Sequence, residues 1–222
     1  MLIPFLKLLS PIFTGYLIGS INLSVVVTKY IGKFDITTKG SGNAGGTNVA
    51  RTMGAKWGIS VIVVEILKGF IVGLFAKYVF PVDPFLLGGL GPEISGAIAV
   101  LACQMGNVFP IFHKFKGGKG VTTCGAVMAV LDIKIFIVLV STFLIIFFIS
   151  HMVSLGAILA SVGMPLSVAI VYYGSPYWWL LFIITFIMSS LLIFRHHSNI
   201  VRILNGTENK FNFGKKKDKS SK

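Results

Sequence analysis

The sequence predicts an all-α protein that crosses the membrane several times as a polytopic helix bundle. Of its 222 residues, 55% are hydrophobic and only 12% are charged, with a mean hydropathy of +0.86. A soluble domain carries roughly 25% charged residues. The apolar residues also fall into runs close to the length of about 20 residues that crosses a bilayer. The net charge of +13 lies between these runs, which a positive-inside bias explains better than nucleic-acid binding.

The first apolar run, 8–30, is predicted to be retained as a span, because it lacks a basic n-region beyond Lys7 and a small-residue cleavage pattern. Gly15, Gly19 and Ser20 give it a small face for close helix packing. The further runs are 57–80, 94–112, 121–131, 135–150, 152–173 and 177–194. Together they predict seven transmembrane helices. Because 121–131 is short for a crossing, the alternative is a five-span bundle in which 121–150 does not cross fully.

The distribution of charge sets the predicted orientation. With the polar segment after the first span placed inside, sixteen of the twenty Lys and Arg residues are inside, against Lys7, Lys77 and Lys134 outside and Lys68 within a span. The positive-inside rule then places the N-terminus outside and the C-terminus in the cytoplasm. The five-span alternative keeps the same sidedness for every polar segment.

Residues 1–208 are predicted to form one transmembrane domain, and the lysine-rich residues 209–222 a disordered cytoplasmic tail near anionic lipid. The predicted cytoplasmic loops are 31–56, 113–120 and 195–208. Cys103 and Cys124 both lie in apolar context and indicate neither a disulfide framework nor a metal site.

The second span contains two charged residues, Glu65 and Lys68, three positions apart. On a helix they share a face and can pair. An ion pair within a span indicates the interior of the bundle, because a charge facing lipid is costly. The alternative is that the pair only joins helices near the interface.

The segment 40–51 reads GSGNAGGTNVAR and contains four glycines and two asparagines. It cannot lie in a lipid-facing helix, because glycine weakens helices and the polar groups need partners. It is predicted to be a loop whose backbone N–H groups converge on an anion, with Arg51 supplying a bidentate fork. The alternative is a flexible cytoplasmic linker.

Two further polar segments lie on the same predicted membrane face. The sequence KGGKG at 116–120 offers two lysines and accessible backbone without the spacing of a Walker loop, and a basic connector is an equal alternative. The segment 195–208 places His196, Asn199 and Arg202 at helical spacing, although an interfacial histidine pair would look alike. Three such clusters on one face, in a chain with few carboxylates, predict a substrate that bears one or more phosphates.

These segments resemble the bacterial acyl-phosphate:glycerol-3-phosphate acyltransferases, integral membrane enzymes of phospholipid synthesis. The motifs that carry the resemblance are SGNAGGTNVAR at 41–51, FKGGKGV at 115–121, and HxxNIxR with GxE within 196–208. They occur in the family's order over nearly the whole chain, with GSIN at 19–22 and FP at 109–110.

The resemblance implies a seven-helix bundle in the bacterial inner membrane with its active site facing the cytoplasm. It also implies transfer of an acyl chain from acyl phosphate to the 1-hydroxyl of glycerol 3-phosphate, giving lysophosphatidic acid and inorganic phosphate. No cofactor or metal is implied, and an upstream enzyme would form the acyl phosphate. Membrane lipid is the other expected partner.

By resemblance, the predicted catalytic residues are Ser41, Arg51, Lys119, His196 and Asn199. The predicted substrate-binding residues are Gly40, Gly42, Asn43, Gly45, Thr47, Asn48, Gly117, Gly118, Gly120, Arg202 and Glu208. Arg51 and Lys119 would neutralise the phosphates, while the glycines let the main chain approach them. His196 either takes the hydroxyl proton or only donates a hydrogen bond while the acceptor's own phosphate takes it. The second role is preferred, because no carboxylate obviously orients the ring.

The chain departs from the family pattern at four places. The family usually has Ala at position 46, Arg near Thr37, Asp at position 65, and His at position 107, where this chain has Gly46, Glu65 and Asn107. An acid–base role at position 107 is therefore excluded. The alternative function is a membrane transporter of a phosphorylated small solute, but the sequence has no internal repeat. A membrane scaffold that uses the basic tail would leave both glycine-rich segments unexplained.

Overall fold

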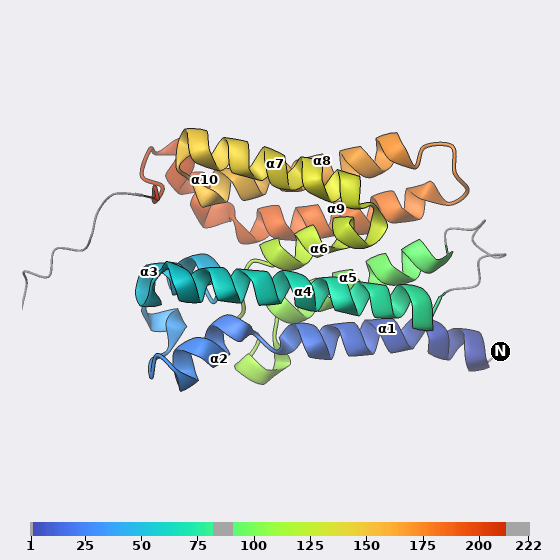
Figure 1. The fold of residues 1–222 in the computed structure, drawn as a ribbon, viewed down its shortest axis with the longest axis horizontal. Helices are drawn as coiled ribbons and strands as arrows, with labels where there is room; N and C mark the ends of the chain where they lie inside the picture. Colours follow the sequence, from blue (N-terminus) through green and yellow to red (C-terminus); the bar gives the residue numbers. More distant parts are fainter. Residues whose placement is uncertain (1, 82–90, 212–222) are drawn as a thin grey trace, which may run out of the picture.

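The computed structural model describes residues 2–81 and 91–211, and the regular structure in these ranges is helical throughout (Figure 1). The helices are α1 Leu2–Ser20, α2 Leu23–Tyr30, η1 Ile36–Thr38, α3 Gly46–Met53, α4 Ala55–Val79, α5 Gly91–Val108, η2 Ile111–His113, α6 Val121–Leu131, α7 Ile133–Ser150, α8 Val153–Val171, α9 Trp178–Arg195 and α10 His197–Leu204. Residues 82–90, between the predicted spans 57–80 and 94–112, and most of the predicted tail, 212–222, lie outside the described residues.

The long helices form a bundle of two groups joined by α5 and α6. On one side α5 packs against α1 and α4, and on the other side α8 packs between α7 and α9, with α6 between the two groups (Figure 1). The small face predicted for the first span is confirmed, since a Cβ on Gly19 would lie 2.1 Å from the Cys103 carbonyl oxygen of α5. The main core lies where α5, α6 and α9 meet, around Val100, Met128 and Met188.

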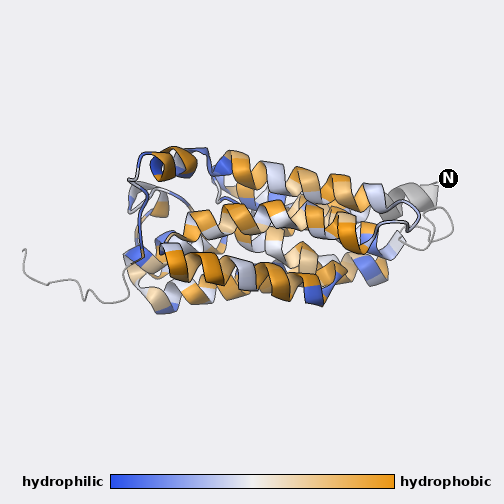
Figure 2. Ribbon diagram, turned by 90° about the horizontal axis from the view of Figure 1, so that it is seen from above, coloured by the Kyte–Doolittle hydropathy of each residue, from blue (hydrophilic) through white to orange (hydrophobic). Residues whose placement is uncertain are grey.

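Six described segments are long and apolar enough to cross a membrane. They are Leu9–Tyr30, Ala55–Val79, Gly91–His113, Ile133–Ser150, Val153–Val171 and Trp178–Arg195, whereas Val121–Leu131 is shorter. Figure 2 shows hydrophobic residues along the middle of the bundle and hydrophilic ones gathered at its two ends. The prediction of an all-helical membrane bundle is confirmed, while the seven crossings and the orientation stay predictions.

Two predicted elements differ from the structure. The first span is not one continuous helix: it breaks at Ile21, and Asn22 begins α2 by accepting the Val25 N–H through Oδ1 at 3.2 Å. The predicted anion loop at 40–51 is a loop only as far as Gly45, because α3 begins at Gly46 and carries Arg51. The break before α2 has a local cause: an asparagine side chain accepts from free backbone amides, so it is favoured at a helix start such as Asn22 and disfavoured within a helix.

Candidate active site

The three polar segments meet at one end of the bundle, where Figure 1 places α2, α3 and α10. They line a cavity of about 800 Å³. The predicted site residues that line this cavity are Ser41, Gly42, Asn43, Gly45, Thr47, Asn48, Arg51, Gly118, Lys119, Gly120, His196, Asn199, Arg202 and Glu208. Gly40 and Gly117 are the predicted residues that do not line it. Segments separated by up to 167 positions in the chain (41 to 208) therefore contribute to one site.

Asn48 holds the first loop in shape. It is buried, its Oδ1 accepts the Ser41 N–H at 2.9 Å, and its Nδ2 donates to the carbonyls of Lys39 at 2.9 Å and Asn43 at 3.0 Å. Gly40 has φ +62°, and a Cβ there would lie 2.1 Å from Asn48 Oδ1. The geometry thus gives Asn48 and Gly40 a role in positioning the loop. Asn48 also lines the cavity, so its predicted substrate contact stays a prediction, whereas Gly40 does not line it.

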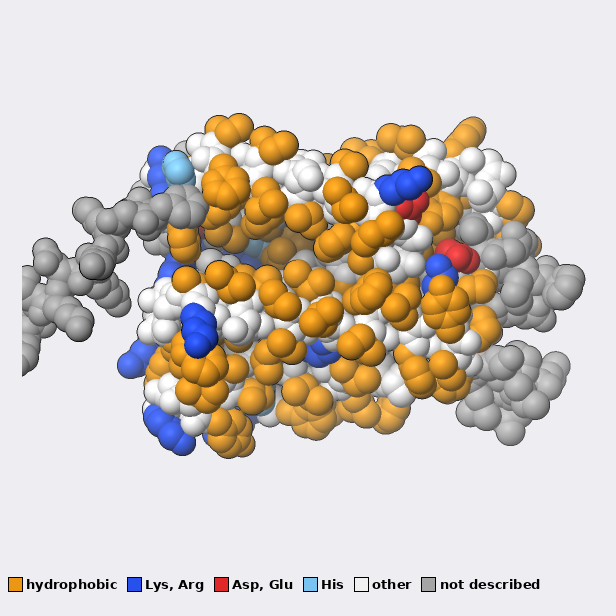
Figure 3. All heavy atoms as spheres, in the orientation of Figure 1, with side chains coloured by type: hydrophobic (Ala, Val, Ile, Leu, Met, Phe, Trp, Pro, Cys, Tyr) orange, Lys and Arg blue, Asp and Glu red, His pale blue; other side chains and the backbone are white. Residues whose placement is uncertain are grey.

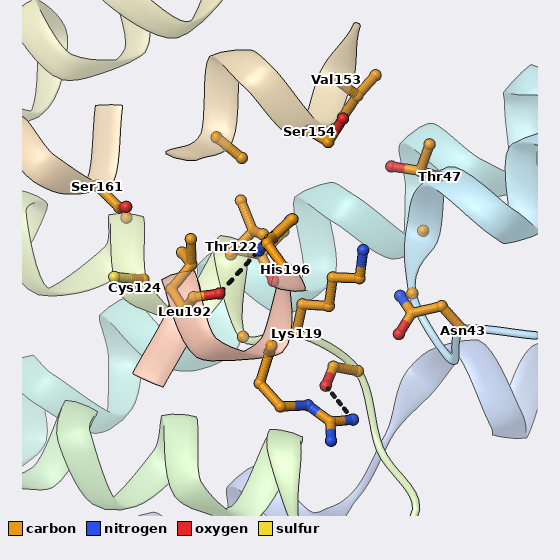
Figure 4. A pocket seen from close by; sticks show the side chains of 18 of the residues that line it. Asn43, Thr47, Lys119, Thr122, Cys124, Val153, Ser154, Ser161, Leu192 and His196 are labelled. Atoms are coloured by element: carbon orange, nitrogen blue, oxygen red, sulfur yellow. Dashed lines mark hydrogen bonds between the residues drawn. The ribbon is translucent and has the colours of Figure 1, made fainter. Parts of the chain in front are cut away.

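The start of α3 faces the cavity and suits an anion. Gly45 precedes the helix without a side-chain cap, and Gly46 and Thr47 of its first turn line the cavity. Free N–H groups at a helix start attract negative charge. Asn43 and Thr47 point toward the end of Lys119 across the cavity (Figure 4), and the half-buried Arg51 lines the same space. Ser41 lies exposed at its edge.

The second loop lies directly against the first. The Gly118 N–H donates to the Asn107 carbonyl at 3.0 Å, and a Cβ on Gly118 would lie 2.8 Å from the Ala44 carbonyl oxygen. A Cβ on Gly117 would lie 2.1 Å from the Asn107 carbonyl oxygen. Arg195 donates to the Gly118 carbonyl at 3.4 Å. These glycines are therefore needed first for contact between protein segments.

Lys119 is the cation at the centre of the cavity. Burial lowers its pKa to about 8, and the nearby charges of Arg202, Arg195 and Arg51 act in the same direction, while Glu208 opposes them. Its ammonium donates to Asn199 Oδ1. At pH 7 the side chain is still mainly protonated, so it carries the charge that a phosphate needs.

Asn199 is held in this orientation by Glu208. Its Nδ2 donates to Glu208 Oε1 at 2.6 Å, and the same oxygen accepts from Ser154 Oγ at 2.7 Å. Arg202 Nε donates to the other oxygen at 2.8 Å. Burial would raise the pKa of Glu208, but these hydrogen bonds hold it below its usual value. The carboxylate contacts protein groups through both oxygens, which gives it a positioning role, and its predicted substrate contact stays a prediction.

His196 is neutral in this environment. Burial, followed by the charge of Lys119, lowers its pKa to about 4. The ring Nδ1 lies 2.8 Å from the Leu192 carbonyl oxygen (Figure 4), and a carbonyl can only accept. The proton of the neutral ring is therefore on Nδ1, and Nε2 is an acceptor. This differs from the preferred sequence-based role of His196 as a hydrogen-bond donor.

The rest of the cavity is an apolar groove. Its lining comes from α4, α6, α7 and α8 and includes Ile62, Met128, Phe136, Leu139, Phe143 and Met164. Figure 3 shows a hollow among apolar side chains between α4 and α7. A charged end and an apolar extension in one cavity fit a molecule that has a phosphate and a hydrocarbon chain.

Sequence reasoning missed several residues of the site. Glu65 and Asn107, two of the departures from the family pattern, line the cavity and contact each other at 2.9 Å between Oε2 and Nδ2. Arg195 and Ser154 also line it. The polar residues within apolar runs were the available signal, but their partners depend on how the helices pack. In the described ranges, no group of three or more His, Cys, Asp or Glu side chains could hold a metal ion.

Comparison with known proteins agrees with this geometry. Residues 9–206 match the family model described as glycerol-3-phosphate acyltransferase. The chain is 40% identical over 196 residues to the glycerol-3-phosphate acyltransferase of Thermoanaerobacter pseudethanolicus, covering 88% of this chain and 91% of that protein. It is 39% identical to the one of Endomicrobium trichonymphae, with 96% and 99% covered.

The fold is also that of a solved membrane enzyme. The chain is similar to PlsY, an integral membrane glycerol 3-phosphate acyltransferase, in its glycerol 3-phosphate form, with a TM-score of 0.81, 33% identity, and 92% of this chain and 95% of that chain covered. The lysophosphatidic acid form of PlsY gives a TM-score of 0.78, 32% identity and the same coverage. The sequence match, the fold and the three motifs around one cavity all point to the same family. This integral membrane protein therefore belongs to the glycerol-3-phosphate acyltransferase family.

Proposed function

We propose that the protein transfers an acyl chain from acyl phosphate to the 1-hydroxyl of glycerol 3-phosphate and releases lysophosphatidic acid and inorganic phosphate. The observation that carries this proposal is the single cavity in which Lys119 and Arg51 lie at one end and the groove lined by Met128 and Phe136 leads away from them. The family favours an acyltransferase over the transporter that was the alternative.

The charge of the cavity supports a donor that carries its own phosphate. Arg51, Lys119 and Arg195 line it, and none of them forms an ion pair with a carboxylate in the part of the chain that the structure describes. Together with the start of α3 they place positive charge where two phosphate groups would lie. Holding two anions side by side is the main cost of bringing these substrates together, because like charges repel.

In the proposed reaction the 1-hydroxyl oxygen of glycerol 3-phosphate attacks the acyl carbon. The bond from that carbon to the phosphate oxygen breaks, and the phosphate leaves. Nε2 of His196 accepts the hydrogen bond of the attacking hydroxyl and orients its lone pair. Because a ring with a pKa of about 4 is a weak base, the proton leaves on a substrate phosphate. Lys119 and Arg51 stabilise the charge that develops on the phosphates.

The membrane placement belongs to the same proposal. Residues 1–208 act as one domain in the bacterial inner membrane, and the cavity opens to the cytoplasm, where glycerol 3-phosphate is dissolved. The acyl chain lies in the groove between α4 and α7. An enzyme that forms acyl phosphate acts upstream.

The test is an assay of the purified protein in detergent with palmitoyl phosphate and glycerol 3-phosphate. Lysophosphatidic acid and inorganic phosphate should form in equal amounts. Palmitoyl-CoA, offered in parallel, should give no product, and Lys119→Ala should lose most of the activity with palmitoyl phosphate. Product from palmitoyl-CoA alone would refute the donor assignment.

A further inference from the structure

The break between α1 and α2 leaves backbone groups that need partners inside the membrane. Lys68 Nζ donates to the carbonyls of Ile21 at 2.9 Å and Gly19 at 3.4 Å, at the end of α1. Glu65 Oε1 accepts the N–H of Leu23, the first residue of α2, at 2.9 Å. The cation is at a helix C-terminus and the anion at a helix N-terminus, the arrangement that helix dipoles favour.

The Glu65 carboxylate also reaches a third helix. Glu65 is 4% exposed, and its Oε2 accepts from Asn107 Nδ2 of α5 at 2.9 Å and lies 2.6 Å from Lys68 Nζ. One side chain of α4 is thus bonded to α2 and to α5 at the inner wall of the cavity. This is the interior ion pair predicted from the sequence, with partners that the sequence did not indicate.

Glu65 is linked to both glycine-rich loops, through Leu23 and the adjacent Asn22 on one side and through Asn107 on the other. Asn22, next to Leu23, donates through Nδ2 to the Ala44 carbonyl of the first loop at 3.1 Å. The carbonyl of Asn107 accepts the Gly118 N–H of the second loop at 3.0 Å. Glu65 therefore lies between the supports of the two loops, which meet where Gly118 faces Ala44.

We propose that Glu65 is a positioning residue that, with Asn107, sets the distance between the loop of Asn43 and Ala44 and the loop of Lys119. The inference rests on the proposed function, because these loops hold the two substrates in register. Glu65 does not contact the reacting atoms; it acts through the two loops. A shift of the loops by a fraction of an ångström misaligns the hydroxyl and the acyl carbon, so the effect appears in turnover.

The first variant is Glu65→Gln, which keeps the size of the side chain and removes its charge. The carboxylate accepts from Leu23 through Oε1 and from Asn107 and Lys68 through Oε2, and a carboxamide would replace one of these oxygens with an NH₂ group that cannot accept. We expect kcat to fall about tenfold or more, while the KM for glycerol 3-phosphate changes less than about threefold, since Lys119 and Arg51 are unchanged.

Glu93→Gln is the matched control. It breaks the Lys77–Glu93 ion pair at 3.2 Å, which joins the same two helices, α4 and α5. Glu93 precedes Asn107 by fourteen residues, or about 21 Å along α5 at 1.5 Å per residue. This variant should lower the melting temperature without lowering kcat.

A double variant that shortens one side chain of the Glu65–Asn107 contact and lengthens the other tests the contact itself. Asp is one methylene shorter than Glu, and the ring of His extends farther than the amide of Asn. Glu65→Asp and Asn107→His should each lower kcat, and the double variant should recover to within about threefold of the wild type, a coupling that independent damage would not give. Asn107→Ala reports on the same contact if the Glu65 variants do not accumulate, and its kcat should also fall.

Normal kcat in both Glu65→Gln and Asn107→Ala would overturn the proposal, as would an equal loss of kcat in Glu93→Gln. Additive losses in the double variant would overturn it as well. An error in the proposed function would show differently, as a wild-type protein that does not use palmitoyl phosphate at all.

Discussion

The pKa of Lys119 predicts an alkaline limit to activity. The side chain binds phosphate only when protonated, and burial lowers its pKa to about 8. The protonated fraction is then about nine-tenths at pH 7 and about one-tenth at pH 9 for a single titration. For the free enzyme, kcat/KM for glycerol 3-phosphate should therefore fall about tenfold between these pH values, because kcat/KM reports groups of the free enzyme.

Lys119→Arg separates this titration from other causes of alkaline loss. A guanidinium does not deprotonate in proteins, so the fall above pH 8 should disappear. The plateau should lie about tenfold below that of the wild type, because the longer planar group cannot reproduce the ammonium contact with Asn199. The assay is the initial rate of lysophosphatidic acid formation from pH 6 to pH 9.5, with chemical hydrolysis of the donor subtracted.

Glu208→Gln provides a second test of the Lys119 titration, in which the fall in activity should move to lower pH and not disappear. The Glu208 charge raises the pKa of Lys119, so its removal should move the alkaline fall to lower pH. The variant should remain folded, because Gln can still accept from Ser154 and Asn199 through one oxygen. An alkaline fall that persists unchanged in Lys119→Arg, or that moves to higher pH in Glu208→Gln, would refute the assignment of this titration to Lys119.

Three further predictions concern the loops and the route of transfer. Arg51→Lys should lower kcat/KM at least tenfold at normal expression, because an ammonium cannot replace a bidentate fork on phosphate; near-normal turnover would remove Arg51 from the site. Gly118→Ala should lower kcat about tenfold or more with smaller changes in both KM values, since its Cβ would lie 2.8 Å from the Ala44 carbonyl oxygen and push the two loops apart; a rise confined to the KM for acyl phosphate would instead support direct contact of Gly118 with the donor. Transfer should proceed without an acyl-enzyme, so labelled acyl phosphate without acceptor should leave no label on the denatured protein; stoichiometric label that is lost in Ser41→Ala and chased into product by glycerol 3-phosphate would contradict this.

The helices and the motif residues could be predicted from the sequence because each depends on local pattern. Apolar length indicated the helices, six of which are long enough to cross a membrane. The chemistry of Arg51, Lys119 and Asn199 predicted an anion site, and the three residues do line one cavity. The break at Asn22 could not be predicted. Whether a polar residue in an apolar run ends a helix depends on partners such as Glu65 and Lys68, which packing supplies.

The roles of individual polar side chains were also beyond the sequence. Asn48 and Glu208 occur in motifs that suit a phosphate, yet their hydrogen bonds go to the protein. The tautomer of His196 follows from the Leu192 carbonyl four residues earlier, a contact set by where α9 ends. A motif therefore indicates which residues gather at a site but does not distinguish those that hold the substrate from those that hold the loops.

The placement of Glu208 accounts for how a carboxylate can belong to the site that we propose for two anions. An unscreened carboxylate near the phosphates would repel both substrates. Here both carboxylate oxygens accept hydrogen bonds from protein groups, and these bonds partly offset the negative charge. The donors are Ser154, Asn199 and Arg202. The charge still helps to keep Lys119 protonated, while the oxygen of Asn199 that faces Lys119 is neutral. The cavity thus keeps a net positive end with a neutral histidine beside it. For the proposed donor, an acyl phosphate that is already activated, this is sufficient, since no residue has to generate a strong nucleophile.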